Sequence, residues 1–284
     1  MQHYMAATHL FRKGIVFTAL VFLAGATPPP SRTWVAIGDS ITYLNDHTDE
    51  TDHRITKGYM TRVVEKVPDL HYVNQGHNGW TAGRIARQID SLGLINAEIY
   101  SIFLGTNDWW SGRPLGRFAD YARKTGNSTV YGSFRIIIDK LRSLNPKARI
   151  LLITPMQRVD FVYLFNLQNN AYGSYKPKNG QTLESFAVAI DSIGRYEHLD
   201  VLDLYHTRSL EMKKLVKYKR LKDPQTGAYR DYPYPQFIGV PFDPKTDAYP
   251  YPIGSIAKTY DGLHPSDEGY AIISRKLVKI LKRY

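Results

Sequence analysis

The stretch Trp34-Val35-Ala36-Ile37-Gly38-Asp39-Ser40 determines the fold class. Four apolar residues in a row, ended by a glycine, are typical of a strand that is buried on both faces of a sheet. The serine that closes the stretch would lie just beyond the carboxyl end of this strand, where a turn into a helix can expose its hydroxyl group. Sites in open parallel sheets form at this edge. The stretch therefore predicts a buried parallel strand with a reactive position at its end.

Strand and helix signals alternate from this stretch to the end of the chain. Further strands are expected over residues 71–74, 98–104, 149–154 and 199–204, and helices over residues 59–67, 81–92, 130–144, 182–196 and 266–281. This alternation predicts an α/β fold, with a central parallel sheet of about five strands and helices on both faces.

Three further segments place chemically useful residues at the same edge of the predicted sheet. They are Asn74-Gln75-Gly76-His77-Asn78-Gly79, Gly105-Thr106-Asn107-Asp108 and Asp261-Gly262-Leu263-His264-Pro265. Ser40, Gly79 and Asn107 each follow an expected strand by a few residues, so we expect them to converge. A tight turn can bring the carboxylate of Asp261 to the imidazole of His264. Acyl transfer needs a nucleophile, a base, an orienting acid and oxyanion donors, and these segments supply all four.

Taken together, the four segments resemble the four blocks of the SGNH (GDSL-type) hydrolase family. The resemblance extends from about residue 33 to the end of the sequence. It implies a three-layer, flavodoxin-like fold that needs neither a metal nor a cofactor. It also implies that Ser40 is the nucleophile and that His264, oriented by Asp261, is the base. Gly79 and Asn107 would then donate to the oxyanion beside the backbone amide of Ser40.

Two other groups of residues offer alternatives. Asp203 and His206 repeat the Asp-x-x-His spacing at the end of the fifth expected strand, but they lack the proline and the helix that follow His264. Residues 46–53 contain several acids and two histidines and could bind a metal, although a solvated surface loop is the commoner structure for such a segment.

Aromatic residues gather near the expected site. Trp80, Trp109 and Trp110 directly follow the second and third segments. Tryptophans at the rim of a site can stack on sugars, while core packing or an acyl pocket is about as common. Residues 205–260 form a long excursion rich in tyrosine and proline, and we expect this insertion to set substrate choice.

Composition excludes several classes of chemistry. The chain of 284 residues contains no cysteine, so disulfides, thiolate catalysis and zinc–thiolate sites are excluded. Its formal charge is +11, but no nucleic-acid-binding motif accompanies this charge, so no nucleic-acid partner is expected. The densest basic cluster, residues 213–220, is interpreted as a solvated helix face.

The first 26 residues are typical of a secretory signal peptide. Arg12 and Lys13 precede an apolar run, and Ala24-Gly25-Ala26 fits the small-residue cleavage rule. A proline-rich linker over residues 27–32 and a hydrolase domain over residues 33–284 would follow. The apolar run is shorter than the roughly 20 residues of a membrane span. We therefore expect an exported protein, periplasmic or secreted, without a stable membrane span after cleavage; an uncleaved anchor is the alternative.

These observations predict an exported serine ester hydrolase. Its substrate would be an acylated small molecule or polysaccharide, from which it would remove a small acyl group, most simply acetyl, through an acyl-enzyme on Ser40. The family resemblance equally admits lipase, thioesterase and arylesterase activities, because fold does not choose among them. A carbohydrate-binding protein without catalytic activity is the alternative from another class.

Overall fold

The computed structural model describes residues 31–284, in which five parallel strands form the central sheet. The sheet runs in the order β2–β1–β3–β4–β7. Its strands are β1 (Arg32–Gly38), β2 (Leu70–Gly76), β3 (Ile99–Phe103), β4 (Arg149–Ile153) and β7 (Asp200–Leu202). Counted along the sheet, this is the 2-1-3-4-5 order of flavodoxin-like folds, in which ligands bind at the carboxyl ends of the strands. The predicted fold class is therefore confirmed.

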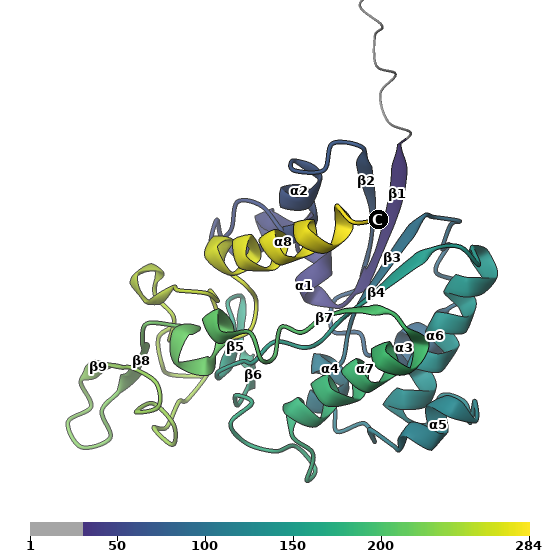
Figure 1. Cartoon of the computed structure of the whole chain (residues 1–284). Coiled ribbons are helices and arrows are strands. Elements are labelled where there is room, and N and C mark those ends of the chain that lie inside the picture. The colour runs from purple at the N-terminus through teal and green to yellow at the C-terminus, as the bar shows by residue number, and fades with distance from the viewer. Residues whose placement is uncertain (1–30) are drawn as a thin grey trace, which may run out of the picture. The chain divides into compact units, whose positions relative to one another are not determined.

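Helices cover both faces of the sheet (Figure 1). They are α1 (Ser40–Tyr43), α2 (Tyr59–Val64), α3 (Ala82–Gln88), α4 (Thr106–Trp110), α5 (Phe118–Ala122), α6 (Val130–Leu144), α7 (Leu183–Glu197) and α8 (Asp267–Leu281). Helices α2 and α8 pack together on one face, while α3, α6 and α7 lie on the other. Four 3₁₀ turns complete the helical structure of the described residues: Thr48–Thr51, Arg208–Leu210, Met212–Lys214 and Ile253–Ser255.

The first strand shows why its sequence is apolar at every position. Trp34 and Ala36 point into the hydrophobic core under α2 and α8, and Val35 and Ile37 point into the core on the other face. All four side chains are fully buried. Because successive strand residues alternate between faces, a strand covered on both sides needs an unbroken apolar run.

Helices α3, α6, α7 and α8 each follow a serine or threonine whose side-chain oxygen accepts a backbone N–H of the first turn. These caps are Thr81, Thr129, Thr182 and Ser266. Such caps satisfy donors that have no partner inside the helix. Helix α6 has the predicted bounds, and the other predicted helices and strands are present with ends shifted by at most four residues.

The excursion of residues 205–260 is folded onto the rest of the domain. It contains a hairpin of β8 (Lys219–Lys222) and β9 (Tyr229–Tyr232). The buried Lys219 pairs with Asp160 at 2.9 Å, and the hydroxyl group of the fully buried Tyr251 donates to the backbone oxygen of the same aspartate. The basic cluster at residues 213–220 is therefore not a helix face, because it ends in strand β8, where Lys219 is buried in an ion pair while Arg220 is exposed.

A second hairpin lies between β4 and α7 and was not predicted. Its strands are β5 (Phe161–Tyr163) and β6 (Asn166–Ala171), which pair antiparallel. Figure 1 shows this hairpin between the sheet and the excursion.

Within residues 31–284, no helix has both the length and the apolar character needed to cross a membrane. The predicted signal peptide and residues 27–30 of the predicted linker lie outside the described residues, and Arg32 at the end of that linker already belongs to β1.

Candidate active site

Three residues predicted from distant segments meet in one hydrogen-bonded line. Ser40 Oγ lies 2.8 Å from His264 Nε2, although the two residues are 224 positions apart in the chain. His264 Nδ1 lies 2.6 Å from Asp261 Oδ2. The other carboxylate oxygen of Asp261 accepts the backbone N–H groups of Leu263 and His264, at 3.0 and 2.7 Å. Both oxygens of this buried acid are thus engaged, which fixes the orientation of the imidazole ring.

The turn that carries Asp261 and His264 depends on a glycine. Gly262 has a φ of +90°, and a side-chain carbon at this position would overlap the backbone oxygen of Asp160. The backbone N–H of Val159 donates to the oxygen of Gly262 at 3.0 Å, which ties the turn to the segment after β4. Only glycine combines this left-handed conformation with so close an approach.

Ser40 stands at the start of α1, and Asp39 caps this short helix. A carboxylate oxygen of Asp39 accepts the backbone N–H of Ile41 at 3.0 Å. Burial raises the pKa of Asp39 to about 6, while the hydrogen bond from Ile41 and the nearby charge of His264 oppose this rise. The cap thus fixes the first turn of α1 and the serine within it.

Gly79 and Asn107 line the same cavity as Ser40 and His264. Within the described residues, the backbone N–H groups of Ser40 and Gly79 have no hydrogen-bond acceptor. The Asn107 amide donates one N–H to the backbone oxygen of Trp80 at 3.1 Å and keeps a second N–H. Three donors beside the serine are therefore available to an oxyanion.

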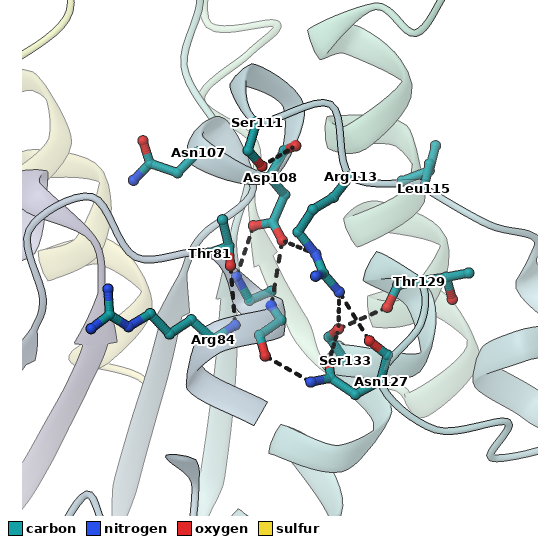
Figure 2. Close-up of polar contacts among 12 residues, drawn as sticks. Thr81, Arg84, Asn107, Asp108, Ser111, Arg113, Leu115, Asn127, Thr129 and Ser133 are labelled. Atoms are coloured by element: carbon teal, nitrogen blue, oxygen red, sulfur yellow. Dashed lines mark hydrogen bonds and ion pairs between the residues drawn. The ribbon is translucent and has the colours of Figure 1, made fainter. Parts of the chain in front are cut away.

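Asp108 links the loop of Gly79 to the helix of Asn107 (Figure 2). Its carboxylate accepts the backbone N–H groups of Ala82 and Gly83, at 2.8 and 3.4 Å, and lies 3.3 Å from Arg113 Nε. Burial raises the pKa of Asp108 to about 6. In Figure 2 the side chain of Asn107 points away from this cluster. The sequence analysis gave Asp108 no role, although its place directly after Asn107 in the third segment could have indicated one.

Of the three tryptophans predicted to contact substrate, only Trp110 lines the cavity. Trp109 is fully buried in the core and donates from its indole to the backbone oxygen of Gln181 at 2.9 Å. Trp80 lies outside the cavity lining, with its ring stacked between His77 and the guanidinium of Arg84. The prediction for Trp109 is therefore wrong, because its ring is buried in the core. The contact of Trp80 with substrate stays a prediction, since its side chain is partly exposed between two residues that line the cavity.

The cavity has a volume of about 490 Å³, and much of its wall comes from residues that the sequence analysis did not single out. The hairpin β5–β6 contributes Phe161, Tyr163, Asn169 and Ala171. Of the excursion at residues 205–260, only Tyr260 lines the cavity. The structure therefore does not support the expectation that the excursion forms the substrate surface.

The alternative histidine lies elsewhere. His206 Nδ1 is 2.7 Å from Asp203 Oδ2, which repeats the geometry of the pair at the serine. Its other nitrogen, however, lies 3.3 Å from Glu184, and the side chain is 48 % exposed. Among residues 31–284, no serine forms a hydrogen bond with this nitrogen, so the pair of Asp203 and His206 lacks a nucleophile.

The acidic segment at residues 46–53 contacts the protein through its side chains. Asp46 accepts hydrogen bonds from Tyr72 and Asn74, at 2.7 and 2.8 Å. Glu50 accepts the hydroxyl group of Tyr43 at 2.8 Å and lines the cavity. Among residues 31–284, no group of three or more histidine, cysteine or acidic side chains is arranged to hold a metal ion.

Comparison with known proteins identifies the family. The model of the GDSL-like lipase/acylhydrolase family matches residues 36–272. The crystal structure of a possible lipase from Chitinophaga pinensis is 60% identical, with a TM-score of 0.88 over 89% of this chain and 98% of that chain. No curated protein matches.

More distant structures share the fold. A protein from Lactobacillus plantarum is 20% identical, with a TM-score of 0.58 over 90% of this chain and 98% of that chain. A carbohydrate esterase family 3 protein from Talaromyces cellulolyticus is 18% identical, with a TM-score of 0.51 over 89% of this chain and 97% of that chain. The four sequence blocks, the sheet order and the family match agree, and the chain belongs to the GDSL-like lipase/acylhydrolase family of hydrolases.

Proposed function

We propose that the protein is a serine ester hydrolase that removes small acyl groups, above all acetyl, from a carbohydrate. The observation that carries this proposal is the line of hydrogen bonds from Ser40 through His264 to Asp261. This line opens on the same cavity as the free donors at Gly79 and Asn107. The arrangement has the parts that acyl transfer needs, each within hydrogen-bonding reach of the next.

In the first half of the reaction, His264 Nε2 takes the proton of Ser40 as Oγ attacks the ester carbonyl carbon. The carbonyl oxygen becomes an oxyanion that accepts hydrogen bonds from the N–H groups of Ser40, Gly79 and Asn107. The tetrahedral intermediate then expels the alcohol, which takes the proton from His264, and the acyl group stays on Ser40. Asp261 remains ionised and stabilises the imidazolium.

In the second half, a water molecule attacks the acyl carbon and passes a proton to His264 Nε2. The same donors hold the second oxyanion. Its collapse breaks the bond to Ser40 Oγ, which recovers the proton from His264, and the carboxylic acid leaves. Water and ester are thus converted into acid and alcohol, with both catalytic side chains restored.

The walls of the cavity support a sugar ester as substrate. Trp110, Phe161 and Tyr163 offer aromatic surface, and Asn78 and Asn169 offer amide groups. Rigid aromatic faces with polar neighbours suit the apolar faces and hydroxyl groups of sugars. A lipase activity is the second candidate, because the Chitinophaga pinensis structure, 60% identical, is described as a possible lipase.

Export is part of the proposal. It is supported by the basic, apolar and small-residue regions of the first 26 residues. Expression in a bacterial host followed by N-terminal sequencing tests it. We expect the mature chain to begin close after Ala26, and an intact N-terminus on a cytoplasmic protein would contradict export.

Active-site labelling and an ester panel test the activity. An organophosphonate should add to the peptide that contains Ser40, and Ser40→Ala should lower kcat by about 10⁴ with the fold intact. His206→Ala, the matched control, should keep activity within about threefold. Labelling of another serine would refute the assignment. A series of p-nitrophenyl esters from acetyl to dodecanoyl separates the candidates, since an acetylesterase should prefer the shortest chain and a lipase the longest.

A further inference from the structure

Arg158 lines the catalytic cavity, yet it is only 2% exposed, and no acid among residues 31–284 forms an ion pair with it. The nearest carboxylates are engaged elsewhere. Asp160 pairs with Lys219 at 2.9 Å, and Asp261 holds the ring of His264 at 2.6 Å. A buried charge without a partner is costly, so a fold that keeps one beside its active site calls for an explanation.

Most of the donors of Arg158 are unused. A guanidinium carries five N–H groups. Within the described residues, the side chain makes one hydrogen bond, from Nη2 to the backbone oxygen of Tyr172 at 3.1 Å, and its buried Nε has no acceptor. Burial lowers the pKa of Arg158 to about 10, so the side chain is still a cation at neutral pH.

Aromatic rings hold the guanidinium in place. Its central carbon lies 5.5 Å from the ring centre of Trp109, 5.2 Å from that of Trp110 and 6.0 Å from that of Phe161. These contacts stabilise a cation partly but accept none of its hydrogen bonds. Because Trp110 and Phe161 also line the cavity, the cation is fixed at the cavity wall with its donors unsatisfied.

Two lysines extend the positive charge. Lys178 Nζ lies 4.3 Å from the ring centre of Trp110, and Lys176 Nζ lies 5.1 Å from that of Tyr172. Neither lysine forms an ion pair within the described residues. We call Arg158, Lys176 and Lys178 together the cationic corner; of the three, Arg158 lines the cavity, and Lys178 lies against the ring of Trp110, which also lines it.

We propose that the ester substrate carries a carboxylate close to the scissile bond and that Arg158 binds this carboxylate. The inference rests on the proposed ester hydrolysis at Ser40 and narrows its substrate class. A carboxylate is planar and accepts parallel N–H bonds from a guanidinium, and it would occupy N–H groups of the Nη atoms that the protein leaves unused. The carboxylate can belong to the alcohol, as in an acetylated uronic acid, or to the acyl group, as in a succinyl ester.

Matched neutral and charged esters test the proposal on the unmodified protein. The acyl arm compares p-nitrophenyl butyrate with mono-p-nitrophenyl succinate, and the alcohol arm compares an O-acetyl methyl glucoside with the corresponding O-acetyl methyl glucuronoside. In one arm, we expect the charged ester to have a kcat/KM about tenfold or more above its neutral partner. This advantage should shrink as salt is raised. If neither charged ester is preferred, the proposal is overturned. If no ester at all is hydrolysed, the proposed function fails instead.

Variants of Arg158 test whether this residue causes the preference for the charged ester. Arg158→Met keeps an unbranched side chain and removes its charge, and it should lower kcat/KM for the preferred charged ester about tenfold more than for its neutral partner. Arg158→Lys keeps the charge without the planar fork and should restore only part of the preference. Equal losses on both esters in a folded Arg158→Met variant would show that Arg158 supports the site's architecture, contrary to the proposal.

A surface variant covers the case in which Arg158→Met does not fold. Lys178→Gln should lower kcat/KM for the preferred charged ester about twofold to fivefold and leave the neutral ester unchanged. Lys147→Gln is the matched control, because Lys147 is exposed before β4, at the opposite edge of the sheet. Equal behaviour of the two lysine variants would contradict a cationic corner that acts on the substrate.

Discussion

At the scale of single residues, two buried carboxyl groups position the reactive atoms. Asp39 caps the turn that carries Ser40, and Asp108 ties the loop of Gly79 to the helix of Asn107. Burial raises the pKa of each acid to about 6, so at neutral pH each charge is held away from water at a cost in stability. Burial of these two carboxyl groups thus lowers the stability of the fold but fixes the geometry of the site.

This exchange predicts how stability depends on pH. The pKa of Asp39 is raised from 3.8 to about 6, so the stability that its neutral form contributes is present below about pH 4 and lost as pH rises through 6. Asp39→Asn cannot ionise. The free energy of unfolding of this variant, relative to the unmodified protein, should therefore rise by about 2–3 kcal/mol between pH 4 and pH 7. Urea denaturation of both proteins at a series of pH values measures this difference in the free energy of unfolding.

Asp69 provides a control of opposite sign. Its hydrogen bond with Arg32 lowers the pKa of its carboxyl group, so its ionised form contributes stability that is lost as pH falls. The loss in the free energy of unfolding caused by Asp69→Asn should therefore grow as pH rises through the acidic range. Parallel slopes for the two variants would contradict the assignment of a buried, destabilised charge to Asp39.

Asn107 is expected to act on the transition state and not on the bound ester. Asn107→Ala should lower kcat roughly 10²–10³-fold and change KM little, because an oxyanion donor acts when charge develops on the carbonyl oxygen. Steady-state kinetics with p-nitrophenyl acetate separates the two constants. A rise in KM with unchanged kcat would place Asn107 in ground-state binding instead.

The residues of the hydrogen-bonded line were predictable because short motifs carry them. Ser40, Asp261 and His264 stand in segments whose spacing alone indicates a turn or a strand end. Arg158 and Phe161 stand in no motif, and their place in the cavity depends on how the chain folds back after β4. Trp109 and Trp110 are neighbours on one short helix, and only the direction of each side chain decides that one is buried and the other lines the cavity.

At the scale of elements, the hairpin β5–β6 forms the wall of the cavity that faces the hydrogen-bonded line. The rings of Phe161 and His264 pack edge to face with their centres 5.5 Å apart, and Tyr163 and Asn169 also line the cavity. Phe165, near the hairpin tip, is 60% exposed. An element that extends from His264, the proposed base, to an exposed aromatic tip is placed to contact a larger substrate.

Replacing Tyr163 and Asn169 by alanine tests this placement. The double variant should raise KM for an acetylated glycan about tenfold and leave p-nitrophenyl acetate hydrolysis nearly unchanged, since remote contacts matter only for substrates that reach them. Tyr229→Ala, on the exposed hairpin β8–β9 outside the cavity, is the matched control and should change neither. A similar KM for the glycan in both variants would exclude β5–β6 from substrate binding.

Long elements were predictable from the period of their apolar residues, and short ones were not. Helix α6 buries one face over four turns, so its pattern repeats often enough to indicate both of its ends. Strands β5 and β8 are three and four residues long. Over such lengths a strand, a turn and a helix end look alike in sequence, which is why the basic cluster at residues 213–220 was mistaken for a helix face.

At the scale of the whole molecule, the excursion at residues 205–260 supports the turn that carries Asp261 and His264. Lys219 and Tyr251 both contact Asp160, and the backbone oxygen of Asp160 lies where Gly262 can have no side chain. The chain from residue 205 to residue 260 thus leaves the sheet and returns to brace the turn of His264.

Replacing residues 223–259 by a short linker should therefore damage hydrolysis of every ester. We expect kcat for p-nitrophenyl acetate to fall by more than about tenfold, together with a lower Tm, because the turn of Asp261 loses its support. Exchange of the exposed turn at residues 224–227 alone is the control and should leave both values nearly unchanged. A folded variant that keeps p-nitrophenyl acetate activity and loses only glycan activity would restore the role in substrate choice expected from the sequence.

The distance of 224 residues between Ser40 and His264 also has a kinetic meaning. A molecule that has assembled β1, β2 and β3 holds its serine but not its base, and it gains the base only when the segment before α8 docks. Under the proposed mechanism, partly folded forms should therefore have no hydrolase activity, whatever their helix content. Recovery of hydrolase activity during refolding should therefore follow the slowest structural phase, and its time course would mark the final step of folding.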